Sequence, residues 1–236
     1  MPRRTREEAA ITREQLLDAA ERVFRDRGVA RTSLAEVATE AGVTRGAVYW
    51  HFRDKADLFA AMCRRAVSPM DAMVERAHGA VGSPLATLRE LCSDALVHLA
   101  RDPRAHAVFE ILFHRSELSG ELAGVAERHE RECRHARARI EALIARAVAA
   151  GALPPDTDSA LAMHALHAYV TGLMHEWTLD PSAYDLSTRA GALVDAFVAG
   201  LVASPPRREA TARPARGVRA AAVGSRRDAG RRAARA

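Results

Sequence analysis

Residues 33–52 read SLAEVATEAGVTRGAVYWHF and predict two short helices joined by a glycine turn. Ser33 and Glu36 have the S-x-x-E spacing of a capping box, which predicts where the first helix begins. Gly42 stands where the chain leaves that helix with a positive φ, a conformation that costs little only for glycine. Thr44 can cap the second helix. The stretch therefore predicts a helix-turn-helix, whose second helix enters the major groove of DNA.

Helical patterns extend in both directions from this motif. Thr12 and Gln15 form a second capping-box pair, which predicts that a helix begins there and ends at Gly28. Asp54 is expected to cap a longer helix that ends near Pro69 or soon after, because proline is tolerated poorly inside a helix. The remaining helical patterns cover residues 85–101, 104–116, 121–150, 157–179 and 186–203. No period-two stretch is long enough for a strand, so the sequence predicts an all-α chain.

Charge is distributed unevenly along the 236 residues. The net charge is +5, yet residues 204–236 alone carry ten arginines against two acidic residues. This Arg/Ala-rich segment cannot bury enough apolar surface to offset its ordering entropy, so it is predicted to be a disordered tail. It can attract DNA nonspecifically, or it can be a solvated extension without function. The high isoelectric point comes mainly from the tail and does not by itself argue for nucleic acid.

The composition narrows the class of protein further. With 48% hydrophobic and 28% charged residues, the chain is typical of a soluble globular protein. No uninterrupted apolar run approaches the roughly 18–20 residues of a membrane span, and the charged N-terminus lacks an export signal. The three cysteines show neither CxxC spacing nor a disulfide-framework count, which favours a reducing cytoplasm. The glycine-rich phosphate loop, the GxSxG elbow and the HExxH motif are absent, so an enzyme is not expected.

The string AGVTRGAVYWHFRDKADLF at 41–59, with GVARTSLAEVA at 28–38, resembles the DNA-binding domain of TetR-family repressors. Within that family the chain is most similar to the AcrR/TtgR branch, which represses multidrug efflux pumps. The likeness continues in PLATLREL at 84–91, EILFHRSEL at 110–118, AGALP at 150–154 and AYVTGLMHEW at 168–177. It covers about residues 3–203 and leaves out only the tail.

The resemblance implies a TetR-like fold with about nine helices. It divides the chain into a three-helix DNA-binding domain at 1–53, a helical ligand-binding and dimerisation domain at 54–203, and the tail at 204–236. A homodimeric repressor of this kind would bind a palindromic double-stranded operator and be released by a hydrophobic small-molecule inducer. The inducer is expected to move the helix that begins at Asp54. No cofactor, metal or membrane partner is implied, and the expected location is the cytoplasm, on the nucleoid.

Eight residues in and around the motif are expected to contact DNA. Arg45 begins the second helix, where it can reach a guanine edge or a phosphate, and Tyr49 can donate a hydrogen bond to a phosphate. Lys55, the only lysine in the chain, lies in the first turn of the next helix, whose N-terminus attracts a phosphate. Trp50 and Phe52 are expected in the core. The predicted DNA contacts are Thr32, Ser33, Thr44, Arg45, Gly46, Tyr49, His51 and Lys55, with capping alone as the alternative role of Ser33 and Thr44.

The resemblance also implies an inducer pocket in the second domain, although the same residues can equally form a packed core. Its apolar and soft side chains suit large, varied hydrophobic ligands. The expected lining is Leu91, Cys92, Leu96, Phe109, Leu112, Phe113, Cys133, Ile140, Met163, His167, Val170, Thr171, Met174 and Trp177. Phe109, Phe113 and Thr171 stand where branch members can have polar or charged pocket residues, which shifts the expected ligands toward apolar compounds.

The last two helices of each subunit are expected to form the dimer interface as a four-helix bundle. Small residues on one helix and an apolar stripe on the other favour close packing, although the core stripe and the interface stripe cannot be separated from sequence. The expected interface residues are Ala165, Ala168, Gly172, Leu193, Val194, Phe197 and Leu201.

Other readings stay open. The pair His164 and His167, and the group His129, Cys133 and His135, leave a metal-responsive regulator possible, but CxxC and HxxxH ligand pairs are absent. A nonspecific architectural DNA binder driven by the tail is a third reading. Within the family, the regulated operon could serve metabolism or antibiotic synthesis rather than efflux.

Overall fold

The computed structural model describes residues 6–116 and 123–208, except for the side chains of residues 123, 125–130 and 132. Within this part the chain forms nine α-helices and one π-helical turn, and its only β-type pairing is an isolated bridge between Thr157 and Arg207. The prediction of an all-α fold is confirmed.

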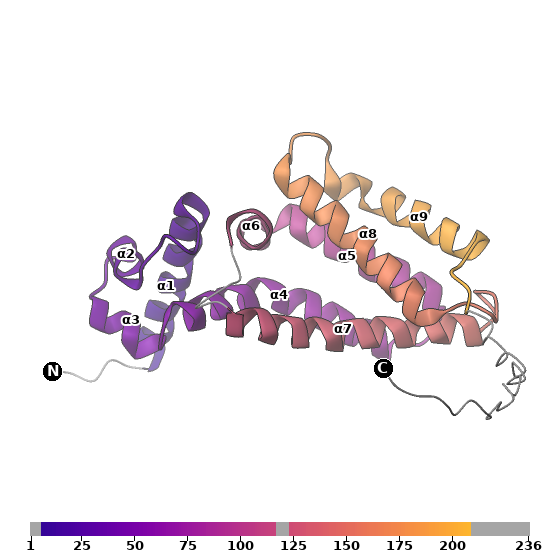
Figure 1. The fold of residues 1–236 in the computed structure, drawn as a ribbon, viewed down its shortest axis with the longest axis horizontal. Helices are drawn as coiled ribbons and strands as arrows, with labels where there is room; N and C mark the ends of the chain where they lie inside the picture. The colour runs from indigo at the N-terminus through magenta and orange to yellow at the C-terminus, as the bar shows by residue number, and fades with distance from the viewer. Residues whose placement is uncertain (1–5, 117–122, 209–236) are drawn as a thin grey trace, which may run out of the picture.

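The first three helices form the unit at the left of Figure 1. Around the turn, Ser33 Oγ accepts from the Glu36 N–H at 3.3 Å, and the Glu36 carboxylate accepts from the Ser33 N–H at 2.8 Å, which completes the predicted capping box. Gly42 has a φ of +67°, and Thr44 Oγ1 accepts from the Ala47 N–H at 3.2 Å. The helices are α1 (Arg6–Arg27), α2 (Leu34–Glu40) and α3 (Arg45–His51).

The predicted start of the first helix is wrong. Helix α1 begins six residues before Thr12, at Arg6, and Thr12 lies within it. Its hydroxyl donates to the Glu8 carbonyl oxygen at 2.9 Å, the bond of a threonine one turn inside a helix. The capping-box spacing of Thr12 and Gln15 therefore lies inside a helix. A threonine hydroxyl can either cap a helix start or bond to the carbonyl oxygen one turn earlier, so the spacing alone does not mark a helix start.

The predicted end of the fourth helix is also wrong. Helix α4 (Lys55–Gly79) continues through Pro69 for a further ten residues. Proline removes one backbone hydrogen bond, but packing on both sides of it holds the helix. Leu58 and Phe59 lie in the core of the first domain, whereas Met70 and Val74 pack against the core of the second.

The second domain consists mainly of long helices; α4 and α7 run along the molecule, and α5, α8 and α9 lie obliquely to them (Figure 1). Helix α4 packs against α7, α5 packs against α9, and α8 contacts both α7 and α5. These elements are α5 (Pro84–Arg101), α6 (Pro103–Glu110), the π-helical turn η1 (Ile111–Arg115), α7 (Ala123–Ala149), α8 (Ser159–Leu179) and α9 (Leu186–Ala203).

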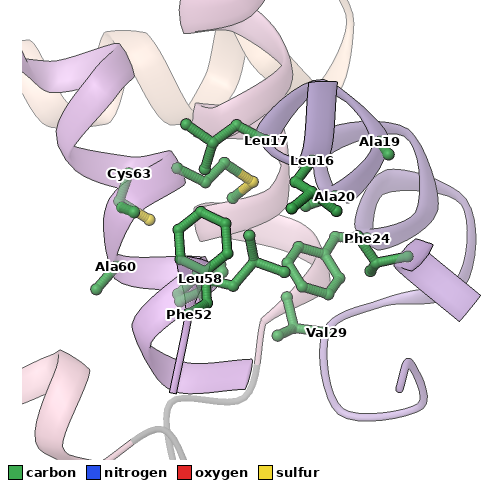
Figure 2. Packing of buried hydrophobic residues seen from close by; sticks show 14 of the residues in the cluster. Leu16, Leu17, Ala19, Ala20, Phe24, Val29, Phe52, Leu58, Ala60 and Cys63 are labelled. Carbon is green, nitrogen blue, oxygen red and sulfur yellow. The ribbon is translucent and has the colours of Figure 1, made fainter. Parts of the chain in front are cut away.

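Two hydrophobic cores stabilise the chain. The first includes Phe24 (Figure 2). The rings of Phe24 and Phe59 meet edge to face with centroids 6.0 Å apart, and burial of each such side chain contributes about 1.5–3 kcal/mol. Val108 of α6 and Ile111 of η1 belong to this same core, so the second domain inserts into the first. Because α4 contributes to both cores, the boundary between residues 53 and 54 stays a prediction.

The predicted tail begins with ordered residues. The Asp158 N–H donates to the Pro206 carbonyl oxygen at 2.8 Å, and the Arg208 N–H donates to the Asp156 carbonyl oxygen at 3.0 Å. Arg207 also pairs with the Asp156 carboxylate at 3.2 Å. The prediction of disorder is therefore wrong for residues 204–208, because residues 206–208 pair with the loop before α8. The rest of the predicted disordered segment, 209–236, lies outside the described residues.

Helix α9 is the one described helix that is long and apolar enough to cross a membrane, with a mean hydropathy of 1.4 over 18 residues. Only 22% of that window is buried within one subunit. Arg189 and Asp195 interrupt it, and Asp195 pairs in two hydrogen bonds with Arg89 of α5. Helix α9 therefore packs one side on α5, while much of its apolar surface is not buried by the rest of the described chain.

Candidate DNA-binding and ligand-binding sites

A hollow on the surface lies between the start of α2, helix α3 and the start of α4. Its lining includes the cationic side chains of Arg45, Arg53 and Lys55, together with Tyr49. Asp57 pairs with Arg53 at 3.3 Å, and the Lys55 ammonium donates to the Ala30 carbonyl oxygen at 3.2 Å. The two helix starts and these cations make this hollow suited to phosphate groups.

Arg45 and Tyr49 face each other one turn apart on α3. The guanidinium donates to the Tyr49 hydroxyl at 3.3 Å and lies over the tyrosine ring at 5.5 Å from its centroid. Both side chains are exposed, as is Gly46 between them. The pair therefore presents one cation and one hydroxyl together on the outer side of α3.

The hydroxyl groups of the predicted DNA contacts are engaged locally. Thr32 is buried, and its hydroxyl donates to the Gly28 carbonyl oxygen at 2.9 Å, so this side chain closes the loop before α2. Ser33 donates to the Glu36 carboxylate at 2.9 Å in addition to capping α2. Thr44 caps α3, and the predicted capping roles of Ser33 and Thr44 are thus observed.

The predicted burial of Trp50 is wrong, whereas Phe52 is buried as expected. Trp50 is 72% exposed, and its ring packs edge-on against His51 with centroids 4.6 Å apart. Val48 is the only buried residue of α3, and a side chain two positions later points to the opposite side of a helix. Because Val48 was expected to face the core, its helical spacing from Trp50 could have predicted that Trp50 is exposed to solvent.

A cavity of about 450 Å³ lies among the helices of the second domain, a size typical of small-molecule sites. Its wall is mostly apolar, with Arg137, His167 and Thr171 as polar groups. Twelve of the fourteen predicted pocket residues line it: Leu91, Cys92, Phe109, Leu112, Phe113, Cys133, Ile140, Met163, His167, Val170, Thr171 and Met174.

Two predicted pocket residues do not line the cavity. Leu96 is fully buried in the second core. The Trp177 indole N–H donates to the Tyr184 carbonyl oxygen at 3.1 Å, and its ring packs against His106 with centroids 5.1 Å apart. This bond fixes the indole against the loop before α9 and away from the cavity.

Sequence reasoning missed the part of the wall that α4 supplies. Val67, Met70 and Val74 line the cavity, as do Arg137 of α7 and Leu166 of α8. The three α4 residues fall around and beyond Pro69, where the helix was expected to end. Their spacing of three and four residues was the available signal.

The turn η1 connects the cavity to the first domain. Phe113 lines the cavity and packs against Phe109 with centroids 5.6 Å apart, while the Arg115 carbonyl oxygen accepts from the Val29 N–H at 3.2 Å. His114 lies 3.0 Å from the Thr178 hydroxyl of α8. Burial, and then the neighbouring His175, lower the pKa of His114. The neutral imidazole is therefore favoured at this contact.

The predicted dimer residues divide into three groups by their burial. Ala165, Ala168 and Gly172 are exposed on α8, where Leu161 and Leu179 are also exposed. Leu193 and Phe197 of α9 are partly buried, with the Phe197 ring stacked on Tyr169 at 5.1 Å. Val194 and Leu201 are buried in the second core, so their assignment to the interface is wrong. These two side chains belong to the second core, and α9 itself packs against α5.

A group of three His, Cys, Asp or Glu side chains with metal-binding geometry is not found among the described residues. The side chain of His129, one member of the group His129, Cys133 and His135, lies outside them.

Two family models match the chain. Residues 16–62 match bacterial regulatory proteins of the tetR family, and residues 83–202 match the C-terminal region of MAATS-type transcriptional repressors. Both models describe transcriptional regulators, which confirms the prediction that the chain is not an enzyme.

Individual relatives agree with the family models. The transcriptional regulator AcrR of Shigella flexneri is 38% identical over 191 residues, or 80% of this chain and 89% of that protein. The structure of NalD, the secondary repressor of the MexAB-OprM multidrug efflux pump in Pseudomonas aeruginosa, has a TM-score of 0.76 and 36% identity, covering 84% of this chain and 100% of that one. The SmeT–triclosan complex has a TM-score of 0.71 and 34% identity, covering 80% and 91%. SmeT represses the Stenotrophomonas maltophilia efflux pump SmeDEF. With its helix-turn-helix, its helical second domain and these relatives, the chain belongs to the TetR family of transcriptional regulators, similar to AcrR.

Proposed function

We propose that this chain is a homodimeric repressor that binds a palindromic operator, releases it when a hydrophobic small molecule fills the cavity, and controls a multidrug efflux operon. NalD and SmeT repress such pumps, and SmeT binds triclosan, a small hydrophobic compound. The apolar cavity of this chain fits ligands of the same kind. The proposed location is the cytoplasm, with the protein on DNA.

The DNA-reading surface in this proposal is the outer side of α3 with the cationic hollow beside it. Arg45 and Tyr49 reach bases or phosphates, Trp50 adds apolar contact, and Lys55 and the N-terminus of α4 bind the backbone. One such domain makes few contacts, so two are needed for a selective site. The exposed faces of α8 and α9 supply the dimer contact.

Helix α4 couples ligand binding to operator binding in this proposal. Its first half lies in the core of the DNA-binding domain, and Val67, Met70 and Val74 of its second half form part of the cavity wall. A ligand that pushes these side chains also moves the DNA-binding helices. Two recognition helices must meet major grooves about 34–36 Å apart, so a small rotation of α4 weakens operator binding. The ligand acts through its different affinity for the two conformations.

An operator-release titration tests this proposal. The operator is found by footprinting DNA around the gene itself, and binding is followed by fluorescence anisotropy at fixed salt. We expect a two-fold symmetric duplex to bind at least about 10³-fold tighter than a scrambled one, and triclosan to weaken binding by roughly 5–150-fold. Equal affinity for both duplexes refutes the operator assignment.

A pair of tryptophan substitutions shows whether release passes through the cavity. Val170→Trp fills the cavity, so the variant is expected to lose its response to triclosan, whereas Ala138→Trp, at an exposed position of α7, is expected to keep it. Release that is unchanged in Val170→Trp contradicts the cavity as the ligand site. A footprint beside metabolic or antibiotic-synthesis genes, with none beside a pump operon, favours the alternative operon.

A further inference from the structure

Three consecutive residues of η1 contact three different parts of the molecule. Phe113 lines the cavity, and the His114 imidazole lies 3.0 Å from the Thr178 hydroxyl of α8. The Arg115 carbonyl oxygen accepts from the Val29 N–H of the first domain at 3.2 Å. Single π-helical turns are rare and occur frequently at functional sites. Along the chain, the contact of His114 with α8 therefore stands between the cavity wall and the first domain.

The hydrogen bonds around Thr178 fix the tautomer of the neutral His114 ring. The Thr178 hydroxyl donates to the His175 carbonyl oxygen at 2.9 Å. Its oxygen can therefore accept from His114 Nε2 but cannot also donate to it. Nε2 of His114 then carries the proton of the neutral ring, and Nδ1 is the position that a second proton takes. Protonation thus adds a positive charge without removing the bond to Thr178.

A second histidine faces His114 from α8. The rings of His114 and His175 meet edge to face with centroids 4.7 Å apart, and the His175 ring also packs against Phe113 at 5.4 Å. His114 is partly buried, whereas His175 is exposed. Two positive charges at such a separation repel each other, while edge-to-face packing suits two neutral rings. The contact is therefore favourable between neutral rings and unfavourable once both are charged.

The charges that act on His114 come from α6, η1 and α8. Burial, and then the neighbouring His175, lower the pKa of His114. Glu110 and the His175 carbonyl oxygen oppose that effect, and Arg115 adds to it. Among the described residues, neither His114 nor His175 forms an ion pair with a carboxylate. A second positive charge at this contact is therefore poorly compensated.

Other charged side chains lie on the elements around η1. Glu176 follows His175 on α8 and raises the pKa of Tyr184, after burial of that ring. Arg137 and His167 line the cavity with Phe113. The charged residues of α1 that border a surface hollow together with Glu110 and Arg115 are Arg22, Arg25, Asp26 and Arg27. Most of these α1 charges are positive, so they do not favour a charged imidazole on η1.

We propose that His114 and His175 form a proton-sensitive latch between η1 and α8. The neutral pair holds η1 in place, and protonation in mildly acidic solution releases η1 and weakens operator binding, so that the protein senses acid as well as hydrophobic ligands. The inference rests on the proposed function, because operator binding is the output that the latch controls.

Linkage gives the direction of the effect. Because the pKa of His114 is lowered, the described conformation binds this proton more weakly than one in which the two rings are apart. Its advantage is full above the ordinary histidine pKa and is lost as pH falls from that value to the lowered one. Separation of the rings moves η1, and with it the Arg115 carbonyl oxygen that holds Val29. Acid therefore favours a conformation in which the first domain is held less firmly.

Operator affinity at two pH values measures the effect. Binding of the full-length dimer is followed by anisotropy at one salt concentration, near about pH 7.5 and about pH 5.5, on either side of the ordinary histidine pKa. Protonation of His51, a predicted DNA contact, can also change operator binding, so the wild type is compared with variants. His114→Gln keeps an N–H for Thr178 but cannot be charged, and we expect it to remove roughly three- to tenfold of the acid-induced weakening. His78→Gln, at an exposed position near the end of α4, is the matched control and is expected to keep it.

A second variant and a direct titration test the pair without altering the His114 ring. His175→Gln leaves the bond between His114 and Thr178 in place but removes the charge opposite it, so the acid effect should shrink in this variant too. NMR of the histidine rings follows protonation itself, with the His114 signal identified by its absence in His114→Gln. We expect a pKa of His114 below the ordinary histidine value in the free dimer. That pKa should rise when triclosan is bound, because ligand and proton favour the same conformation.

The inference is overturned if wild type and His114→Gln lose operator affinity equally in acid, or if triclosan leaves the pKa of His114 unchanged. It is also overturned if circular dichroism shows a loss of helix at the acid pH, because operator release then reflects unfolding. In each of these cases, release by triclosan at neutral pH leaves the proposed function standing. If the wild type selects no operator at either pH, the proposed function fails and this inference fails with it.

Discussion

Replacing Arg65 by methionine is expected to weaken the attachment of the DNA-binding helices to α4. The Arg65 side chain is 15% exposed and contacts three carboxylates of α1, at 2.8 Å from Glu14, at 2.9 Å from Asp18, and in a hydrogen bond with Glu21. The Glu21 side chain is only 11% exposed, and burial raises its pKa although Arg65 opposes that rise. Methionine fills a similar volume without charge, so Glu21 is left as a buried carboxylate without its main partner.

The size of the effect follows from this burial. Breaking a buried ion pair by removing one partner costs about 3–5 kcal/mol. Glu14 and Asp18 are 49% and 37% exposed and can regain water, so the cost comes mainly from Glu21. We therefore expect the lower end, about 3 kcal/mol. For a chain of this size, that lowers Tm by roughly 6–12 °C.

The loss is expected to depend on pH. A raised pKa in the folded state means that the folded chain holds the Glu21 proton at pH values where the unfolded chain has released it. Stability therefore falls as pH rises from the ordinary glutamate pKa through the folded-state pKa, and the penalty is absent below that window. Without Arg65 the window extends upward, so Arg65→Met should lose more stability near about pH 8 than near about pH 5 relative to wild type.

Thermal unfolding followed by circular dichroism, at one protein concentration and both pH values, measures this prediction. Arg104→Met is the matched control: Arg104 is 57% exposed and lies 3.6 Å from Asp18, so its loss should cost at most about 1 kcal/mol. Glu21→Gln in the Arg65→Met background removes the buried charge and should restore part of the stability. Equal losses for the two arginine variants, or a loss that does not change with pH, refute the reasoning.

Three further predictions concern DNA binding and assembly. Arg45→Ala and Tyr49→Ala should each weaken operator binding by about 1–3 kcal/mol in a salt-controlled titration, and unchanged affinity for both removes α3 from the role of recognition helix. Gly46→Ala should stabilise α3 by about 0.5–1 kcal/mol in thermal unfolding yet weaken operator binding, because its added methyl stands on the exposed side; tighter operator binding contradicts that placement. Phe197→Glu should give monomers that do not bind the operator, and a dimer that persists in small-angle scattering counts against the α8–α9 interface.

Local signals predicted the helix-turn-helix correctly. The hydrogen bonds of the Ser33 capping box, the positive φ of Gly42 and the Thr44 cap each depend on residues a few positions apart. Propensity and capping act at this range, so they can be read from one sequence. The same capping rule failed at Thr12, because the spacing cannot show whether a helix has already begun.

The cavity shows where family resemblance helped and where it did not. The pocket residues named from the resemblance lie mostly around the cavity, but Val67, Met70 and Val74 were missed. Met70 and Val74 lie beyond Pro69, where the helix was expected to end, and Val67 lies just before it. A proline removes a hydrogen bond locally, whereas the two cores that hold α4 on either side of it are assembled from distant parts of the chain. Tertiary packing outweighed the local effect of the proline, and the predicted pocket therefore lacked the residues that α4 contributes.

The sequence could not show which apolar residues of α9 face the core of the subunit and which face the dimer partner. One helix can bury two faces against different partners, and both faces are apolar. Val194 and Leu201 pack against the subunit's own core, whereas Phe197 is only partly buried beside Tyr169. At 100° per residue, Phe197 lies about 60° from Val194 and about 40° from Leu201 around the helix, so the apolar residues of α9 serve two adjacent surfaces. Within one subunit most of the helix is left unburied, which is costly for an apolar face unless something covers it. A second copy of α8 and α9, with the exposed Ala165, Ala168 and Gly172 allowing close approach, is the cover that the proposed dimer supplies.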